Sequence, residues 1–424
     1  MKTGEKSTFK KTTMTTLAIT ALCSATAMAH DIGHEHEHVE DGWNSDAGFV
    51  SDVDIEAKLW NPRGKSEEEI GIRAEYLAKF FDLGRTAEER AADADIKSRY
   101  ADAIVINSLM PSGIGIQGVG PEKFEEAADH NHDNGISLIS VSVYAFVGVH
   151  DVSFQDTLDR TDAAIEELGL VKAQTVDDIR QAQADGKLAV IYNAQGGDFT
   201  IEDMSKVQWA KGSGIEVMNF TYNNDNALAG GGQNTENNGA TELGIEFIKR
   251  MNDANIIVDC SHSSDQACID AAKYSTKPVI ASHSGTKAVY DHGRNLSDEA
   301  ATAIADSGGV ICAAGVGLFL NAEGEATMEA LAKHVNYVGE LVGREHTCYG
   351  SDYSYMYKAF LNSFIDVVDK YPPEKGFAAP TQNSGGRDIW GIARVLEDQY
   401  GWSEDDIRGF LGENLMRVYE ANWN

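Results

Sequence analysis

The chain has 424 residues and a formal net charge of −32, with 42% hydrophobic and 24% charged residues. This composition is typical of a folded globular protein and excludes a disordered, collagen-like or disulfide-scaffold chain. The acidic excess also excludes a nucleic-acid binder that neutralises phosphates, because such proteins need clustered Lys and Arg, and it disfavours polybasic attachment to anionic lipid.

Residues 1–29 are typical of a secretory signal sequence. Four lysines precede a short apolar run from Leu17 to Ala27, and Ala27-Met28-Ala29 fits an A-x-A cleavage site. The run is too short to cross a bilayer, and no later window is apolar enough for a transmembrane helix. We therefore expect a periplasmic or secreted protein with no membrane insertion after signal cleavage.

Residues 30–99 are expected to form an extension outside the main domain. Imidazole and carboxylate groups alternate from His30 to His38 and can capture Zn²⁺ or Cu²⁺ loosely, but we prefer an unstructured acidic tail. Farther along, the pattern predicts a helix from Ser66 to Phe81.

From about residue 100 to residue 424, short apolar runs alternate with helical patterns. The runs are Ala103–Asn107, Ile136–Tyr144, Leu188–Ala194, Ile215–Phe220, Ile256–Ser261, Pro278–His283, Gly309–Ala314 and Thr347–Ser351. Such runs are typical of parallel strands buried on both faces. Between them, Leu243–Asn252 has the helical period, and Ser297 and Ser403 are helix-start signals. Eight strands alternating with helices predict an α/β fold, a (β/α)₈ TIM barrel. The alternative is a doubly wound open sheet, but no G-x-G-x-x-G follows the first strand.

Four cysteines remain after signal cleavage: Cys260, Cys268, Cys312 and Cys348. An oxidising compartment permits disulfides. However, Cys260, Cys312 and Cys348 lie in strand-like apolar runs, which favour buried free thiols. No C-x-x-C spacing indicates a zinc ribbon or a redox motif.

In a (β/α)₈ barrel, the active site lies at the carboxyl ends of the strands. Candidate residues at these ends are Gln195 and Asp198 after the third strand, Tyr222 and Asn223 after the fourth, His262 after the fifth, His283 after the sixth and Asp352 after the eighth. Two histidines and an aspartate can converge on one point and form the ligand set for zinc or another first-row metal.

These residues also carry a family resemblance. The chain contains Val258-Asp259-Cys260-Ser261-His262-Ser263, Ser282-His283-Ser284 and His292-Gly293-Arg294-Asn295 in this order, with Gly350-Ser351-Asp352-Tyr353 farther on. Over roughly residues 100–424 the sequence resembles the renal or membrane dipeptidase family (peptidase family M19) of the amidohydrolase superfamily.

The resemblance implies a barrel that holds two zinc ions near the strand ends and cleaves dipeptides. By position, His262 and His283 match two zinc ligands, Arg294 matches the residue that binds the substrate carboxylate, and Asp352 matches the residue that accepts and donates the proton. These roles agree with the chemistry of guanidinium–carboxylate pairs, of metal-activated water and of carboxylate bases.

Five positions depart from the family pattern. Leu109 and Pro111 stand where the first strand should supply an H-x-D pair, and Gln195 replaces the bridging glutamate. Asp198 and Tyr222 each replace a histidine. Because a neutral amide bridges two dications poorly and Leu109 cannot ligate, a standard two-zinc centre is not expected.

Two interpretations remain open. In the first, the protein is a metallo-dipeptidase-like hydrolase with one zinc ion held by His262, His283 and either Gln195 or Asp352, while Arg294, Tyr222 and Asn223 contact a dipeptide or related small molecule. In the second, the barrel binds a small peptide or zwitterion through Arg294 without hydrolysis. Retention of His262, His283, Arg294 and Asp352 favours the first.

Several further residues have more than one interpretation. Asp198, His130 or His132 could substitute as metal ligands, although a helix-terminal surface turn is preferred for the two histidines. Asp259 could orient an imidazole or cap the next helix. Gly230–Gly232 is expected to be a flexible loop over the pocket mouth. A homodimer is compatible with the sequence.

Overall fold

The computed structural model describes residues 60–145, 153–363, 366 and 368–423. All of these belong to one compact unit. The expected signal sequence and the His30–His38 tail lie outside the described residues. Among the described helices, none is long and apolar enough to cross a membrane.

Eight parallel strands form a nearly closed barrel, as the sequence predicted. With the short β3, which lies outside the barrel order, the sheet has nine strands: β1 (Ile106–Met110), β2 (Leu138–Ala145), β3 (Val171–Lys172), β4 (Ala189–Gln195), β5 (Ile215–Asn219), β6 (Ile257–Asp259), β7 (Ile280–Ala281), β8 (Val310–Ala314) and β9 (Thr347–Gly350). Their order is β1-β2-β4-β5-β6-β7-β8-β9, and the short β3 pairs only with β4. The barrel closes between β1 and β9, where the Asp352 amide donates to the Leu109 carbonyl (3.1 Å) and the Ser108 hydroxyl donates to the Tyr349 carbonyl (3.0 Å).

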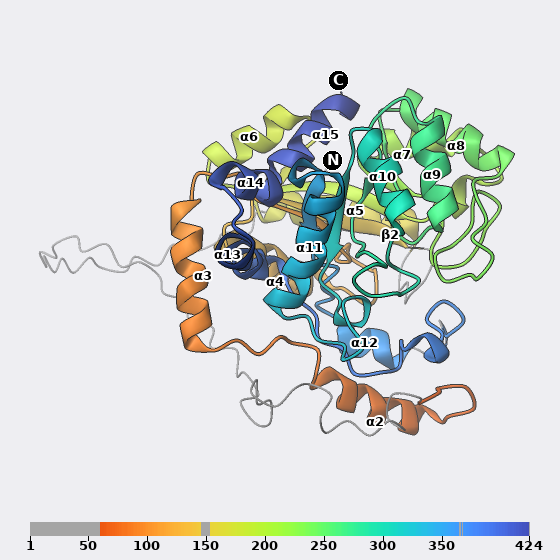
Figure 1. Ribbon diagram of the computed structural model, residues 1–424. Helices are drawn as coiled ribbons and strands as arrows, with labels where there is room; N and C mark the ends of the chain where they lie inside the picture. Colours follow the sequence, from red (N-terminus) through yellow and green to blue (C-terminus); the bar gives the residue numbers. More distant parts are fainter. Residues whose placement is uncertain (1–59, 146–152, 364–365, 367, 424) are drawn as a thin grey trace, which may run out of the picture. The chain divides into compact units, whose positions relative to one another are not determined.

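Helices alternate with these strands and surround the barrel (Figure 1). They are α2 (Glu67–Ala78), α3 (Ala87–Arg99), α4 (Pro121–Asp133), α5 (Phe154–Glu167), α6 (Val176–Ala184), α7 (Lys206–Gly212), α8 (Glu242–Asp253), α9 (Asp265–Tyr274), α10 (Asp298–Asp306), α11 (Met328–Val342), α12 (Tyr357–Asn362), α13 (Ile389–Tyr400), α14 (Glu404–Arg408) and α15 (Asn414–Trp423). The expected start signals are confirmed, because Ser66, Ser297 and Ser403 each accept a hydrogen bond from an amide of the first turn.

The interior of the barrel has an apolar half and a polar half. One buried cluster contains alternate strand residues and residues of α15: Ile106, Leu138, Ile191, Val217, Ile257, Ile280, Val310, Cys348, Leu415 and Tyr419. The side chain of Asn422 in α15 also donates to the Pro278 carbonyl just before β7, so α15 covers the amino ends of the strands. Nearer the carboxyl ends, the buried strand residues are polar: Ser108, Ser140, Ser142, Asn193, Asn219 and Asp259. This polar layer underlies the candidate site.

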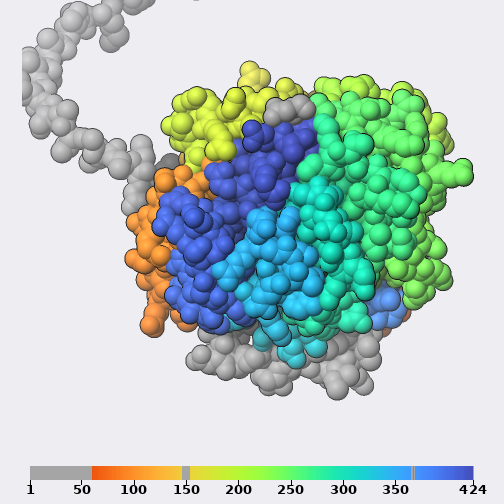
Figure 2. All heavy atoms as spheres, turned by 45° about the horizontal axis from the view of Figure 1, so that its top comes forward, coloured from red at the N-terminus to blue at the C-terminus, as the bar shows by residue number. Residues whose placement is uncertain are grey.

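Two helices precede the barrel and pack on its outer elements. Helix α2 packs against α12, and α3 packs against α13. Figure 2 shows the orange atoms of α3 beside the dark blue atoms of the C-terminal helices. The boundary expected near residue 99 remains a prediction, although α3 ends at Arg99 and β1 begins at Ile106.

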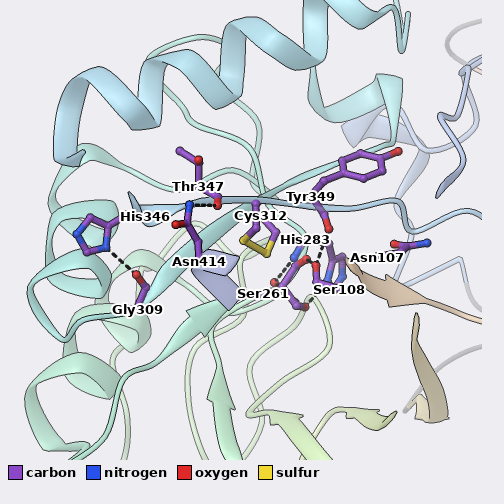
Figure 3. The surroundings of a disulfide bond; sticks show 12 residues. Asn107, Ser108, Ser261, His283, Gly309, Cys312, His346, Thr347, Tyr349 and Asn414 are labelled. Atoms are coloured by element: carbon purple, nitrogen blue, oxygen red, sulfur yellow. Dashed lines mark hydrogen bonds between the residues drawn. A yellow bond between two sulfur atoms is a disulfide. The ribbon is translucent and has the colours of Figure 1, made fainter. Parts of the chain in front are cut away.

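The expectation for two of the cysteines was wrong. Cys312 and Cys348 form a disulfide, while Cys260 and Cys268 are buried free thiols. The two bonded residues are direct register partners on the neighbouring strands β8 and β9, with Cα atoms 4.1 Å apart. An apolar run predicts a buried strand but not its register, so this pairing was not available from sequence. Figure 3 shows the disulfide between Asn414 and Thr347 on one side and His283 and Ser108 on the other.

We expect the disulfide to stabilise the barrel substantially. It joins residues 36 apart in the sequence, and loop-closure entropy predicts a loss of about 4 kcal/mol in the free energy of unfolding for the Cys312→Ser, Cys348→Ser variant. Urea unfolding with and without reductant measures this difference. Reductant should have little effect on the variant, and equal stability of wild type and variant would contradict the expectation.

Candidate active site

Residues from several strand ends meet above the polar layer. Gln195 ends β4, Asn223 follows β5, His262 follows β6 and His283 follows β7, and all four side chains are buried. Asp352 follows β9 at the same end of the barrel. Asn223, His262 and Asp352 have positive φ angles of 65°, 70° and 51°. Non-glycine residues rarely adopt this conformation, and it clusters at functional sites.

The two histidines face each other through the same ring nitrogen. His283 Nε2 lies 2.8 Å from His262 Nε2, and His262 Nε2 lies 2.9 Å from Gln195 Oε1. Burial, reinforced by the positive charge of Arg294, lowers the pKa of both imidazoles well below the ordinary value of 6.5. Both rings are therefore neutral at pH 7, and each carries a single proton.

Amide oxygens face both ring nitrogens of His262. The Asn223 amide group donates to the Lys370 carbonyl (2.8 Å), so its oxygen faces His262 Nδ1 at 2.7 Å. On the other side, Gln195 Nε2 donates to the Ser142 hydroxyl (2.7 Å), which leaves Gln195 Oε1 facing the ring. An amide oxygen accepts only, so the single proton of His262 can lie on either nitrogen. When it lies on Nδ1 and is donated to Asn223, Nε2 presents a lone pair.

Hydrogen bonds place the proton of His283 on Nδ1. The Ser282 hydroxyl donates to Asp259 Oδ2 (2.5 Å) and therefore accepts from His283 Nδ1 (2.7 Å). Asp259 also accepts from the Ser261 and Ser282 amides. Helix α9 is capped by Ser264 instead, so of the two roles considered for Asp259, orientation of an imidazole is the one that the structure supports.

When the His262 proton lies on Nδ1, three lone pairs converge without a proton among them: two imidazole Nε2 atoms and Gln195 Oε1. Such an arrangement is repulsive unless a cation lies between the groups, and neutral imidazoles are ligands for zinc and other first-row metals. The donor set therefore fits one divalent metal. It contains only two residues of the His, Cys, Asp and Glu types, and among the described residues no group of three or more of these could hold a metal.

We expect Asp259→Asn to weaken metal binding about 10- to 100-fold, because an asparagine cannot fix the Ser282 hydroxyl and His283 as the carboxylate does. Competition with a chromogenic zinc chelator measures the affinity. Asp265→Asn is the control, because Asp265 pairs with Lys287 and accepts from the Ser297 amide. Unchanged zinc affinity in Asp259→Asn would contradict the orienting role.

Aromatic and charged side chains lie beside the two histidines. The Tyr222 ring stacks on the His262 ring with centroids 4.0 Å apart, and its hydroxyl contacts that of Tyr371. Burial raises the pKa of Asp352 to about 7, and the nearby positive charge of Arg294 opposes this rise. Arg294 is itself buried, with its guanidinium 5.2 Å from the centre of the Phe319 ring and Nη2 donating to the His283 carbonyl (3.2 Å). The site thus combines a buried cation with a carboxyl group that titrates near neutrality.

Other residues considered as ligands lie elsewhere. His130 contacts the Tyr355 hydroxyl (2.7 Å), and His132 contacts the Gly186 carbonyl (3.0 Å), so both remain in the last turn of α4. Asp198 accepts from the Asn226 amide group (3.1 Å). Leu109 is fully buried and contributes backbone contacts to Ser351 and Asp352.

Sequence reasoning missed Tyr371 and Lys370. They belong to the long connection between β9 and α13, and this connection has no motif that indicates contact with strand ends. The Ser142 hydroxyl, which orients Gln195, was also missed. Its position near the carboxyl end of β2 was the available signal, since it shares the inner face with Ser140.

Comparison with known proteins places these features in context. The sequence model of membrane dipeptidase (peptidase family M19) matches residues 131–371. A Pseudomonas aeruginosa amidohydrolase structure is 23% identical, with a TM-score of 0.66, and the match covers 78% of this chain and 99% of that chain. A probable dipeptidase from the same organism is 17% identical, with a TM-score of 0.61 and coverage of 79% and 99%.

A third solved structure is a Rhodobacter sphaeroides metallo peptidase liganded with a phosphinate mimic of the dipeptide L-Ala-D-Ala. It is 18% identical, with a TM-score of 0.56 and coverage of 76% and 100%. At these identities the three structures support the barrel fold.

Proposed function

Because the chain belongs to the membrane dipeptidase family (peptidase family M19), we propose that it is a metal-dependent hydrolase that cleaves a dipeptide or related small amide. We further propose one metal ion, zinc in the first instance, held by His262, His283 and Gln195. The observation that carries this proposal is the approach of His262 Nε2 to both His283 Nε2 (2.8 Å) and Gln195 Oε1 (2.9 Å), with the proton of His283 held on Nδ1. A bound divalent metal supplies a Lewis acid and makes water more acidic.

The chain's own residues supply the remaining functions. Arg294 is a buried guanidinium suited to bind the carboxylate of a small zwitterion with two hydrogen bonds. Asp352 is our proposed acceptor of a proton from water and its donor to the leaving amine, because its pKa of about 7 matches neutral conditions. Tyr222 and Asn223 hold His262 from two sides, and we assign both to contact with the substrate.

We also propose that the protein acts in the periplasm or outside the cell. The sequence of residues 1–29 and the Cys312–Cys348 disulfide support this proposal, since disulfides persist in oxidising compartments.

A dipeptide panel that includes D-amino-acid C-termini tests the activity. Protein stripped with chelator is assayed before and after zinc is added. We expect turnover only with zinc, and its removal on renewed chelation. Binding of dipeptides without cleavage under any divalent metal would overturn the hydrolase proposal and favour a non-hydrolytic binding protein on the same barrel.

A further inference from the structure

A glycine-rich segment after β5, Gly230–Gln233, packs directly onto the site. The Gly232 amide donates to the His262 carbonyl (2.8 Å), and the Gln233 amide donates to the Asn223 carbonyl (2.9 Å). A Cβ atom on Gly231 would lie 2.3 Å from the Asn223 carbonyl oxygen, and one on Gly232 would lie 2.5 Å from that of Gly293. The expectation of a flexible loop was therefore wrong: the glycines allow backbone to pack on backbone.

This packing buries the side chain of Gln233 with nothing to bind. The residue is 6% exposed, and within the described part of the chain neither Nε2 nor Oε1 has a hydrogen-bond partner. Buried amide groups are normally paired, because desolvation without a partner is costly. An unpaired glutamine in a closely packed segment beside His262 and Asn223 points to a ligand.

The neighbours of Gln233 indicate the chemistry of that ligand. A Cβ atom on Gly293 would lie 3.0 Å from Gln233 Oε1, so the amide packs against the residue that precedes Arg294. Arg294 is 2% exposed, and its Nε also lacks a partner among the described residues. Two buried side chains with unused N–H donors, one of them cationic, thus belong to adjoining segments.

We infer that Gln233 and Arg294 together bind the free carboxylate of the substrate, with Gln233 Nε2 as a neutral second donor. This inference rests on the proposed function, which supplies a substrate with a free carboxylate. Arg294 provides the single positive charge that one carboxylate needs, and the uncharged amide adds a hydrogen bond without a second cation. Gln233 is then a substrate-binding residue that helps to select a free C-terminus.

The Gln233→Glu variant tests this inference, because it places a carboxylate where it would pair with Arg294 and repel the substrate. Affinities of a dipeptide and of its C-terminal amide are measured by calorimetry on the full chain stripped of metal, and KM and kcat are measured on the zinc-loaded protein. We expect Gln233→Glu to weaken dipeptide binding about tenfold or more and to change kcat less, while the amide is affected little. Gln233→Met keeps the side-chain volume but not the N–H donor, so it should reduce the preference for the dipeptide over its C-terminal amide by a smaller factor.

Asn234→Asp is the matched control, because it makes the same charge change at the next residue. Thermal unfolding verifies that each variant is folded. The inference is overturned if the wild-type protein binds the dipeptide no better than its amide, or if Gln233→Glu weakens both ligands equally. Failure of the hydrolase proposal gives a different result. The wild-type protein then shows no turnover, but it still binds the dipeptide better than its C-terminal amide.

Discussion

The His283→Ala variant is expected to bind zinc at least about 100-fold more weakly than the wild-type protein and to lose zinc-dependent hydrolysis. Removal of the ring takes away one of three converging lone pairs and leaves the Ser282 hydroxyl without its partner. The effect should exceed that of Asp259→Asn, because a ligand is lost instead of its orientation. Zinc affinity by chelator competition and dipeptide turnover are the two measurements.

His346→Ala is the matched control. His346 lies at the amino end of β9, where Nδ1 contacts the Gly309 carbonyl at 2.7 Å. It is therefore at the opposite end of the barrel from the strand-end site, and zinc affinity should be unchanged. If His283→Ala kept wild-type zinc affinity and turnover, His283 would not be a ligand.

The Asp352→Asn variant is expected to lose about 100- to 10,000-fold in kcat while still folding and binding zinc. The amide cannot accept the proton that the carboxylate is proposed to take.

The Asp352→Asn variant should be at least as stable as the wild-type protein at pH 7. Because the pKa of Asp352 is raised, the folded state keeps a proton between about pH 4 and 7 that the unfolded state has released. The free energy of unfolding of the wild-type protein therefore falls as the pH rises through this range.

The same carboxyl group predicts the pH dependence of the wild-type enzyme. Because the base must be ionised, kcat/KM should rise with pH through about 7 and then level off. The residual activity of Asp352→Asn should lack this rise. Asp369→Asn, at an exposed ion pair with Arg63, should keep the wild-type profile. An unchanged profile in Asp352→Asn would exclude Asp352 as the titrating base.

The barrel was predictable because each buried strand is a contiguous apolar run. The exact residue at which each strand ends was not predictable. The runs Ile256–Ser261 and Pro278–His283 yield the shorter strands β6 and β7, Ile257–Asp259 and Ile280–Ala281. At these ends side chains replace the strand ladder: Asp259 accepts from the Ser282 amide, and the Ser261 hydroxyl accepts from the His283 amide. Strand hydrogen bonds therefore stop where the polar network begins.

The site was predictable only where strand ends supply it. The carboxyl-end rule brought Gln195, His262 and His283 to one point, and the structure places their atoms within hydrogen-bond distance. Tyr371 comes from a connection without regular pattern, and Gln233 acquires its position from backbone packing between loops. Such contacts depend on tertiary packing, which the local sequence does not encode.

A zinc titration of activity decides whether one metal ion per chain supports hydrolysis. It uses chelator-stripped protein in which His30, His34, His36 and His38 are changed to serine, so that the N-terminal segment does not compete for zinc. We expect dipeptide hydrolysis to rise linearly with zinc and to reach its plateau at one equivalent per chain. A plateau only at two equivalents, or zinc binding without hydrolysis, would contradict it.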